Sequence, residues 1–315
     1  MVSLAPLPLS LAFLERYRIR ARRHYRPSLV GGHLMRRKGQ SLEFHELVPY
    51  ILGDDIRYVD WRASARHGAA KDLLVRSFVS EEQLTLVISV DTCDTMRLPE
   101  AMPKMQIAFW LAEAVALIAL RSDDRVVLHR LFGRSRVGEM SGSSDFRRKR
   151  SGVRSILRRF GEGNAATTAN LAVLRPHLPP AAVWLILTDL YLGDDQASML
   201  AREIATVQDG LRWVILIDLD SWPHEKAILG EGVRLIEGPG RRSSDTPVDI
   251  HAQNILKVEA EIKGHKQRFR QSIRRAGCDV VSWQWPAVGC PEPDQFFRSA
   301  FTEDKVLQRL FMREA

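Results

Sequence analysis

The chain has 315 residues, of which 45% are hydrophobic and 27% are charged, and this composition is typical of a folded globular protein. It excludes intrinsic disorder as the main state of the chain. Lysine and arginine number 46 against 38 aspartate and glutamate residues, a formal net charge of +8, so the chain attracts phosphates, anionic membranes and acidic proteins. Charge alone does not select one of these partners.

The cysteines and the apolar segments narrow the class of protein further. Cys93, Cys278 and Cys290 lie far apart with no Cys-x-x-Cys pair, which excludes a disulfide framework and a thiolate zinc site. The amino terminus is apolar first and basic afterwards, the reverse of a secretory signal, and the longest apolar run, residues 105–120, is too short to span a bilayer. These features predict a cytoplasmic protein with no membrane span.

Residues 1–82 are predicted to form an irregular, β-rich module. They contain dense basic runs and many turn-forming residues, with only short apolar stretches. At Leu84 the pattern changes, because LTLVISVD is a short β-rich run that ends in the acidic Asp91. We therefore expect a domain boundary here, with residues 83–315 as the second domain.

Strands and helices alternate along the second domain. Strands are predicted over 84–91, 124–132, 181–187, 211–220 and 278–283, with a short one at 233–236, and helices over 103–121, 146–160, 171–177, 194–208, 251–276 and 293–313. This order predicts an α/β fold with a Rossmann-like, doubly wound and mostly parallel sheet, which binds ligands at the carboxyl ends of its strands.

Two acids that follow predicted strands, Asp91 and Asp189, suggest a metal site at that edge. Asp91 begins the run Asp-Thr-Cys-Asp-Thr, and hard divalent cations prefer carboxylate and hydroxyl oxygens. The pattern resembles the metal-ion-dependent adhesion site of the von Willebrand factor A fold, which is Asp-x-Ser-x-Ser, then a distant Thr and a distant Asp. The resemblance implies Mg²⁺ or Mn²⁺ held by Asp91, Cys93, Thr95, Thr168 (or Thr167) and Asp189.

Cys93 departs from this pattern, because it replaces the first serine and a thiol is a poor ligand for magnesium. The alternative is that Asp91 and Asp189 only accept hydrogen bonds from the backbone that follows them, as helix caps do. A haloacid-dehalogenase pattern fails by one residue, since the second acid is Asp94 rather than residue 93. A metal-dependent hydrolase also lacks an identifiable nucleophile or general base.

The most specific motif is an acidic and basic block upstream of the predicted sheet. Acids and guanidinium groups alternate along it, which favours a lattice of ion pairs with Trp61 as an apolar anchor over a recognition surface or a catalytic cluster. Its residues are Gly53, Asp54, Asp55, Arg57, Asp60, Trp61 and Arg66.

With Glu43-Phe44 before it and Asp91 to Met96 after it, this block resembles the bacterial family known as domain of unknown function 58. The resemblance implies a von Willebrand factor A-like fold. It also implies work with a MoxR-type AAA+ ATPase, and with other von Willebrand factor A proteins, in the maturation or assembly of a client protein.

A basic run on the predicted helix 146–160 is the remaining feature. Seven cations lie within 13 residues, beginning with Arg147, Arg148, Lys149 and Arg150. Stacking aromatic residues are sparse nearby, so a solvated face or a docking patch for an acidic partner is favoured over a nucleic-acid site. No glycine-rich phosphate loop is present, and no nucleotide cofactor is expected. The sequence thus predicts a non-enzymatic interaction protein; the alternatives are a nucleic-acid-binding protein and, less favoured, a metal-dependent hydrolase.

Overall fold

The protein is described by a computed structural model. It describes residues 4–19, 42–50, 59–66, 73–80, 84–132, 137–140, 146–162, 171–180, 182–208, 212–229, 232–234, 248–286 and 291–313. The chain divides into two compact units: a smaller one, Arg23–Gln83, and a larger one made of Met1–Arg22 with Leu84–Ala315. The first residues therefore belong with the larger unit, whereas the sequence assigned them to a module of residues 1–82.

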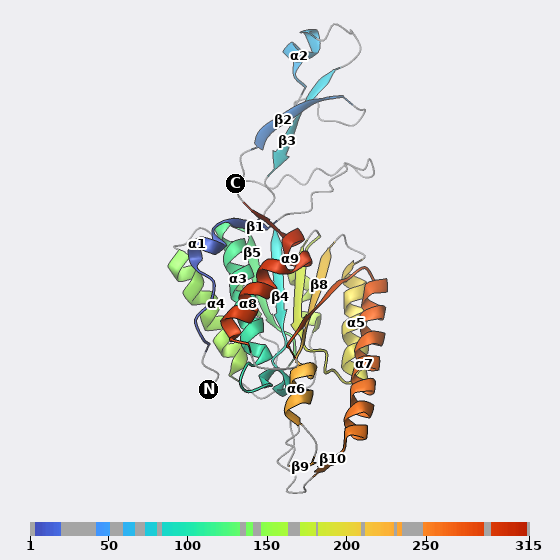
Figure 1. Cartoon of the computed structure of the whole chain (residues 1–315). Helices are drawn as coiled ribbons and strands as arrows, with labels where there is room; N and C mark the ends of the chain where they lie inside the picture. The colour runs from blue at the N-terminus through green and yellow to red at the C-terminus, as the bar shows by residue number, and fades with distance from the viewer. Residues whose placement is uncertain are drawn as a thin grey trace. The chain divides into compact units, whose positions relative to one another are not determined.

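The larger unit is built on a six-stranded sheet with the order β11-β8-β7-β4-β5-β6 (Figure 1). Its strands are β4 (Thr85–Val90), β5 (Arg125–Arg130), β6 (Val137–Met140), β7 (Val183–Thr188), β8 (Trp213–Asp220) and β11 (Asp279–Gln284). All neighbours are parallel except β6, which runs antiparallel to β5 at the edge. Of these strands, the central β4 comes first along the chain. The sheet is then extended on one side by β5 and β6, and on the other side by β7, β8 and β11. This is the von Willebrand factor A-like, doubly wound arrangement, and the predicted fold class is confirmed.

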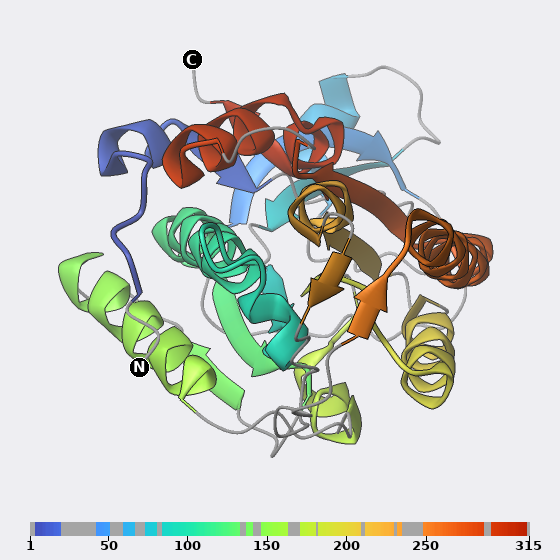
Figure 2. The same ribbon diagram turned by 60° about the horizontal axis from the view of Figure 1, so that its bottom comes forward.

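Helices cover both faces of this sheet (Figures 1 and 2). One face packs against α3 (Lys104–Arg121), α4 (Phe146–Gly161), α8 (Pro293–Glu303) and α9 (Lys305–Leu310), and the other against α5 (Asp194–Gln208) and α7 (Ala252–Arg275). Because side chains alternate across a strand, Leu86 and Ile88 of β4 join the core on the α3 side and Val87 joins the core on the α5 side. Every strand residue of β4 is buried, which explains its unbroken apolar sequence.

The amino-terminal segment is part of the α3-side core. Leu4, Leu7 and Leu9 are buried there. The carbonyl of Ala5 accepts a hydrogen bond from Trp110 Nε1 at 3.2 Å, and Ala5 N donates to Gln106 Oε1 at 3.2 Å. After α1 (Leu11–Leu14), β1 (Tyr17–Ile19) pairs antiparallel with β12 (Phe311–Arg313) at the other end of the chain. The apolar start of the sequence therefore packs against the sheet's own helices.

Several predicted elements are divided or shifted. The helix predicted over 293–313 breaks at Asp304, whose Oδ1 accepts hydrogen bonds from Val306 N and Leu307 N and so begins α9. The helix predicted over 171–177 is two 3₁₀ turns, because Pro176 supplies no N–H. The short strand predicted at 233–236 is β9 (Gly232–Arg234), which pairs with β10 (Val248–Ile250) outside the main sheet. The sequence did not predict β6 or α6 (Trp222–Leu229).

The smaller unit contains an antiparallel pair of strands, β2 (Leu42–Pro49) and β3 (Leu74–Ser80), with a register irregularity between Phe44 and Glu46. The short helix α2 (Trp61–Arg66) lies between them in sequence. Asp60 N donates to Leu74 O at 2.8 Å, and Leu74 N donates to Ser64 Oγ at 2.9 Å, so the start of β3 is fastened to this helix.

Candidate functional site

The carboxyl ends of three neighbouring strands bring acidic side chains to one edge of the sheet. Asp91 follows β4, Asp189 follows β7, and Asp218 and Asp220 close β8. In Figure 1 this is the edge that carries α6, β9 and β10. Asp91, Asp189 and Asp218 are fully buried, so each carboxyl group needs a partner inside the protein.

Asp91 is held by two neutral donors. Its Oδ1 accepts a hydrogen bond from Cys93 N at 2.9 Å, and its Oδ2 accepts one from Thr188 Oγ1 at 2.8 Å. Burial, and after it the nearby carboxylate of Asp189, raises the pKa of Asp91 to about 6. Asp91 therefore fastens the loop after β4 to the end of β7.

Asp189 faces a buried ammonium group. Nζ of Lys104, the first residue of α3, lies 3.0 Å from Asp189 Oδ2 and 3.2 Å from Glu225 Oε1 of α6. The Lys104 side chain is 0% exposed. Burial opposes the charge on Lys104, but the carboxylates of Asp189 and Glu225 outweigh it and raise the lysine pKa above its ordinary value. Lys104 is thus a permanent cation inside this edge.

Tyr191 links this ion pair to a second one. The backbone at Leu190 has a φ of 59°, in the left-handed region, and turns the chain sharply after Asp189. Tyr191 N then donates to Asp189 Oδ1 at 3.1 Å. The centroid of the Tyr191 ring is 4.7 Å from Lys104 Nζ and 4.5 Å from Lys266 Nζ, both within the range of a cation–π contact.

The second cluster joins β8 to α7. Lys266 Nζ lies 3.3 Å from Asp218 Oδ1 and 3.0 Å from Asp220 Oδ1, and Arg270 also pairs with Asp218. Burial raises the pKa of Asp218, with Lys266 and Arg270 opposing the rise. The pKa of Asp220 is lowered, because Lys266 outweighs the effect of burial there. The charges at this edge are therefore paired with one another.

The described residues of the predicted metal site do not fit a divalent cation. An ammonium group already neutralises Asp189, and burial, followed by the charge of Asp91, raises the pKa of the Cys93 thiol, so it stays protonated and is a poor ligand for a hard ion. Thr95 lies in the same edge loop, on the 3₁₀ turn Asp94–Arg97, and Thr168 is outside the described residues. In the part of the chain that the structure describes, no group of three or more His, Cys, Asp and Glu side chains could hold a metal ion.

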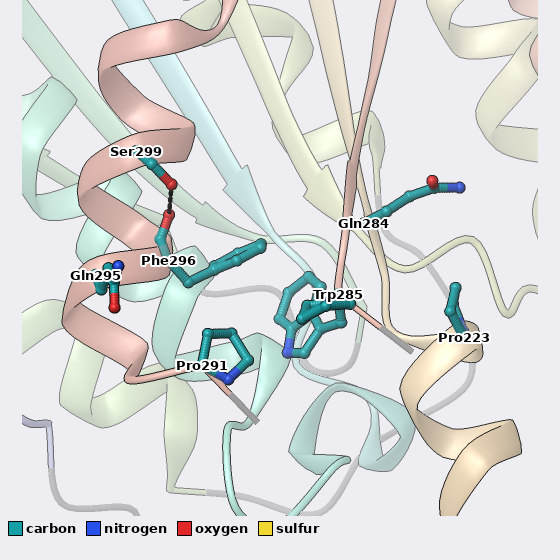
Figure 3. Close-up of a pocket in the computed structure, with 8 residues that line it drawn as sticks. Pro223, Gln284, Trp285, Pro291, Gln295, Phe296 and Ser299 are labelled. Carbon is teal, nitrogen blue, oxygen red and sulfur yellow. Dashed lines mark hydrogen bonds between the residues drawn. The ribbon is translucent and has the colours of Figure 1, made fainter. Parts of the chain in front are cut away.

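Two open grooves lie at this edge. One, of about 850 Å³, runs between the loop after β7 and α7 and is lined by Leu190–Asp194, Ala260–Ile262, Gly264–Lys266 and Arg268. The other, of about 560 Å³, is lined by Pro223, Gln284, Trp285, Pro286, Pro291, Gln295, Phe296 and Ser299. Figure 3 shows the rings of Trp285 and Phe296 facing each other in this second groove, and their centroids are 4.6 Å apart.

The acidic and basic block is only partly within the described residues. Gly53, Asp54, Asp55 and Arg57 lie outside them. Asp60 precedes α2, and its Oδ1 accepts hydrogen bonds from Arg62 N at 3.1 Å and Ala63 N at 3.0 Å, which is a helix cap. Trp61 is 60% exposed and Arg66 is exposed. Most of the block lies outside the described residues, so the expectation that Trp61 supplies its apolar anchor stays a prediction.

The basic run on α4 is divided between the interior and the surface. Lys149 is buried and donates to Leu120 O at 2.7 Å, and Arg150 Nε lies 3.1 Å from the buried Glu113. Arg147 and Arg148 are exposed. One face of α4 packs against the core, so Lys149 and Arg150 point toward the interior while Arg147 and Arg148 point toward solvent. Only part of the predicted patch is available to a partner.

Sequence reasoning missed Lys104, Tyr191, Glu225 and Lys266. A signal existed for the second cluster, because the strand WVILIDLD ends in two acids and its Asp218 lies in the apolar run, where a carboxylate needs a cation. Lys104 gave no comparable signal, since a lysine before an apolar helix is usually solvated.

The chain is similar to one protein family and to several solved structures. The profile of the family described as "Protein of unknown function DUF58" matches residues 46–220. None of the curated proteins matches. Among solved structures, an aerotolerance-related membrane protein from Bacteroides fragilis is 13% identical with a TM-score of 0.39, covering 70% of this chain and 100% of its own. The conserved hypothetical protein BatB from Bacteroides thetaiotaomicron is 13% identical with a TM-score of 0.39, and the match covers 63% of this chain and 90% of BatB. The SpRpn10 VWA domain is 10% identical with a TM-score of 0.38, and the match covers 72% of this chain and 98% of that domain.

The expected cytoplasmic location is wrong, because the first of these structures belongs to a membrane protein. Within the described residues, no helix combines the length and the hydropathy needed to cross a bilayer.

Proposed function

We propose that this chain, which belongs to the DUF58 family of proteins of unknown function, is a non-enzymatic adaptor that binds a partner protein at the carboxyl edge of its von Willebrand factor A-like sheet. The observation that carries this proposal is the groove at Trp285 and Phe296. Its eight lining residues include no carboxyl, imidazole, thiol or amine group. The described lining residues include no general acid or base that could activate the hydroxyl of Ser299, so this groove is better suited to binding than to catalysis.

The charged groups at the same edge support binding over catalysis. Lys104 is paired with Asp189 and Glu225, and Lys266 with Asp218 and Asp220. A general acid or base must exchange a proton with substrate, whereas these groups are committed to one another and largely buried. The pairs are suited to holding the edge loops in one geometry.

The lining of the groove favours an extended peptide segment as its occupant. Phe296 and the prolines offer apolar surface, which packs against aliphatic or proline side chains, and the ring of Trp285, which is 1% exposed, supports Phe296 from the interior. Gln295 adds an amide group that can hydrogen-bond to a peptide backbone. The Ser299 hydroxyl instead donates to Phe296 O at 3.2 Å (Figure 3), and Gln284 Nε2 donates to Asp220 Oδ2 at 3.3 Å. The segment is therefore expected to be apolar and uncharged.

A MoxR-type AAA+ ATPase is the partner that the family resemblance implies, with a client protein whose maturation or assembly the two assist. Binding is tested by calorimetric titration of the full chain with such an ATPase. Gln295→Arg and Ser299→Arg place bulky charges in the groove, and we expect each to weaken binding at least about tenfold, or about 1.4 kcal/mol.

The matched control for this titration is Gln271→Arg, on an exposed position of α7 that does not line the groove. It makes the same change of side chain and is expected to leave the affinity unchanged. Equal affinity for all variants would remove the groove from the interface. If the ATPase does not bind the unaltered chain, that partner is excluded, and an apolar peptide library then tests the groove by itself.

A further inference from the structure

We infer that the ammonium group of Lys104 takes the place that a divalent metal ion has in the adhesion site of von Willebrand factor A folds. The chain supplies its own cation, and the edge of the sheet is organised without a metal. This inference concerns the site's own stability and is independent of which partner the protein binds.

The inference is based on the surroundings of one nitrogen atom, Lys104 Nζ, which contacts two carboxylates and one aromatic ring. Lys104 Nζ is 3.0 Å from Asp189 Oδ2, 3.2 Å from Glu225 Oε1 and 4.7 Å from the Tyr191 ring centroid. Asp189 is the acid that the adhesion-site pattern assigns to the metal's surroundings. Glu225 also accepts a hydrogen bond from Ser221 Oγ, which fixes its orientation.

Among the described residues, the other groups of this site leave a divalent ion little to bind. Both oxygens of Asp91 accept hydrogen bonds, from Cys93 N and from Thr188 Oγ1, so this carboxyl group already has its donors. Cys93 offers a thiol where the adhesion-site pattern has a hydroxyl oxygen. The buried ammonium group would also repel a second cation next to Asp189. This repulsion is strong because little water is present in the interior to screen it.

An internal ammonium differs from a metal in one practical respect, because a chelator cannot remove it. Lys104 joins three elements: the start of α3, the loop after β7 through Asp189, and α6 through Glu225. These contacts are present whenever the chain is folded. The edge loops therefore keep one conformation and do not alternate between a metal-free and a metal-loaded form.

The first test is a titration of the full, chelator-treated chain with Mn²⁺, followed by electron paramagnetic resonance. Free Mn²⁺ gives a strong signal that specific binding removes, and we expect the added ion to stay free into the millimolar range. The thermal midpoint is expected to be the same in EDTA and in MgCl₂ at matched ionic strength. Saturable Mn²⁺ binding that Asp189→Asn abolishes would overturn the inference.

The second test removes the cation. Lys104→Met keeps an unbranched side chain but leaves Asp189 and Glu225 facing each other without a counter-charge, so the thermal midpoint should fall well below that of the wild type. Adding Asp189→Asn removes one of the unpaired charges and is expected to recover part of this loss. A double variant less stable than Lys104→Met would show that Lys104 acts by packing alone and would overturn the inference.

A milder pair of variants keeps the test decisive if Lys104→Met does not fold. Glu225→Gln removes one partner of the ammonium group at the rim of the site, where the carboxylate is 19% exposed. Glu261→Gln makes the same change at an exposed position of α7. We expect a lower thermal midpoint for Glu225→Gln than for Glu261→Gln, and equal midpoints would contradict the role of Lys104.

Discussion

Arg154 of α4 and Glu113 of α3 form a salt bridge with 3.0 Å between Nη1 and Oε2, and the carboxylate is completely buried. Arg150 Nε lies 3.1 Å from the other oxygen of Glu113. Arg154 Nη2 also donates to Leu4 O at 2.6 Å. One carboxylate thus fixes α4 on α3, and one guanidinium group fixes the amino-terminal segment on both helices.

Removing the charge of Glu113 should destabilise the larger unit. Glu113→Gln leaves two guanidinium groups facing a neutral amide, and we expect the free energy of unfolding to fall by about 2–3 kcal/mol. Urea denaturation measures the loss. The control is Arg148→Gln on the exposed face of α4, expected to change stability by less than about 0.5 kcal/mol. Similar losses in both variants would mean that the α3–α4 salt bridge contributes no more to stability than an exposed charge does.

Asp124 should make the protein less stable at alkaline pH. Its Oδ1 accepts a hydrogen bond from Leu84 N at 2.9 Å, and burial, with a further contribution from Asp123, raises its pKa to about 7. The folded state therefore holds a proton that the unfolded state, with a pKa near 3.8, has lost. Stability is therefore lost as the pH rises from about 3.8 to about 7, and the full cost of the ionised form is present above pH 7.

Asp124→Asn keeps an acceptor for Leu84 N and removes the charge. We expect this variant to be more stable than the wild type by about 1–2 kcal/mol near pH 8, with the gain shrinking as the pH falls below 7 and reaching zero only near pH 4. Chemical denaturation at the two pH values gives the comparison. Asp195→Asn, at an exposed position of α5, makes the same change and is expected to alter stability by less than about 0.5 kcal/mol at both pH values. A constant difference at both pH values would mean that Asp124 is not protonated near neutrality.

His129 should act with the opposite sign. Its Nδ1 and Ser89 Oγ are 2.9 Å apart in the buried sheet, and burial, with His177, lowers the pKa of His129 to about 4. Below about pH 6.5 the unfolded state takes up a proton that the folded state does not, so stability present above pH 6.5 is lost as the pH falls toward 4. His129→Gln is expected to flatten this acid limb of the stability profile. An acid limb as steep as that of the wild type would exclude His129 as its source.

The exposed face of α4 allows the nucleic-acid alternative to be tested. Arg148 and Arg158 are exposed, whereas Lys149 is buried and cannot be reversed without disturbing the fold. We expect Arg148→Glu combined with Arg158→Glu to leave the affinity for a single-stranded oligonucleotide weak and unchanged in a fluorescence anisotropy titration. Tight binding that falls steeply with salt and is lost in this variant would instead favour nucleic acid as the ligand.

The centre of the sheet could be predicted from sequence because its strands are buried on both faces. The three central strands β4, β7 and β8 are short, largely apolar runs, and a run such as that of β4 is hard to mistake for a surface helix. The edge strand β6 was missed because it has only four residues and is not such a run. The acids after β4 and β7 were found for the same reason, since they interrupt apolar runs at their carboxyl ends.

The counter-ions of those acids could not be predicted. Lys104 and Glu225 are 121 positions apart, and their ion pair exists only because α3 and α6 meet at one edge of the folded sheet. The α4 cations show the same limit. Helical periodicity can divide Lys149 from Arg148, but the acid that receives Arg154 lies 41 residues earlier on another helix.

The pairing of β1 with β12 has a consequence for how this chain can be divided. The segment Arg23–Gln83 leaves the larger unit after β1 and returns to it just before β4, so it is an insertion joined to its host at both ends. A truncation that starts the chain at Leu84 would also delete Leu4, Leu9, Leu14 and a strand that holds the last residues in place. Excising the insertion and joining its flanks with a short linker leaves the host complete, and this is the form in which the two units can be studied apart.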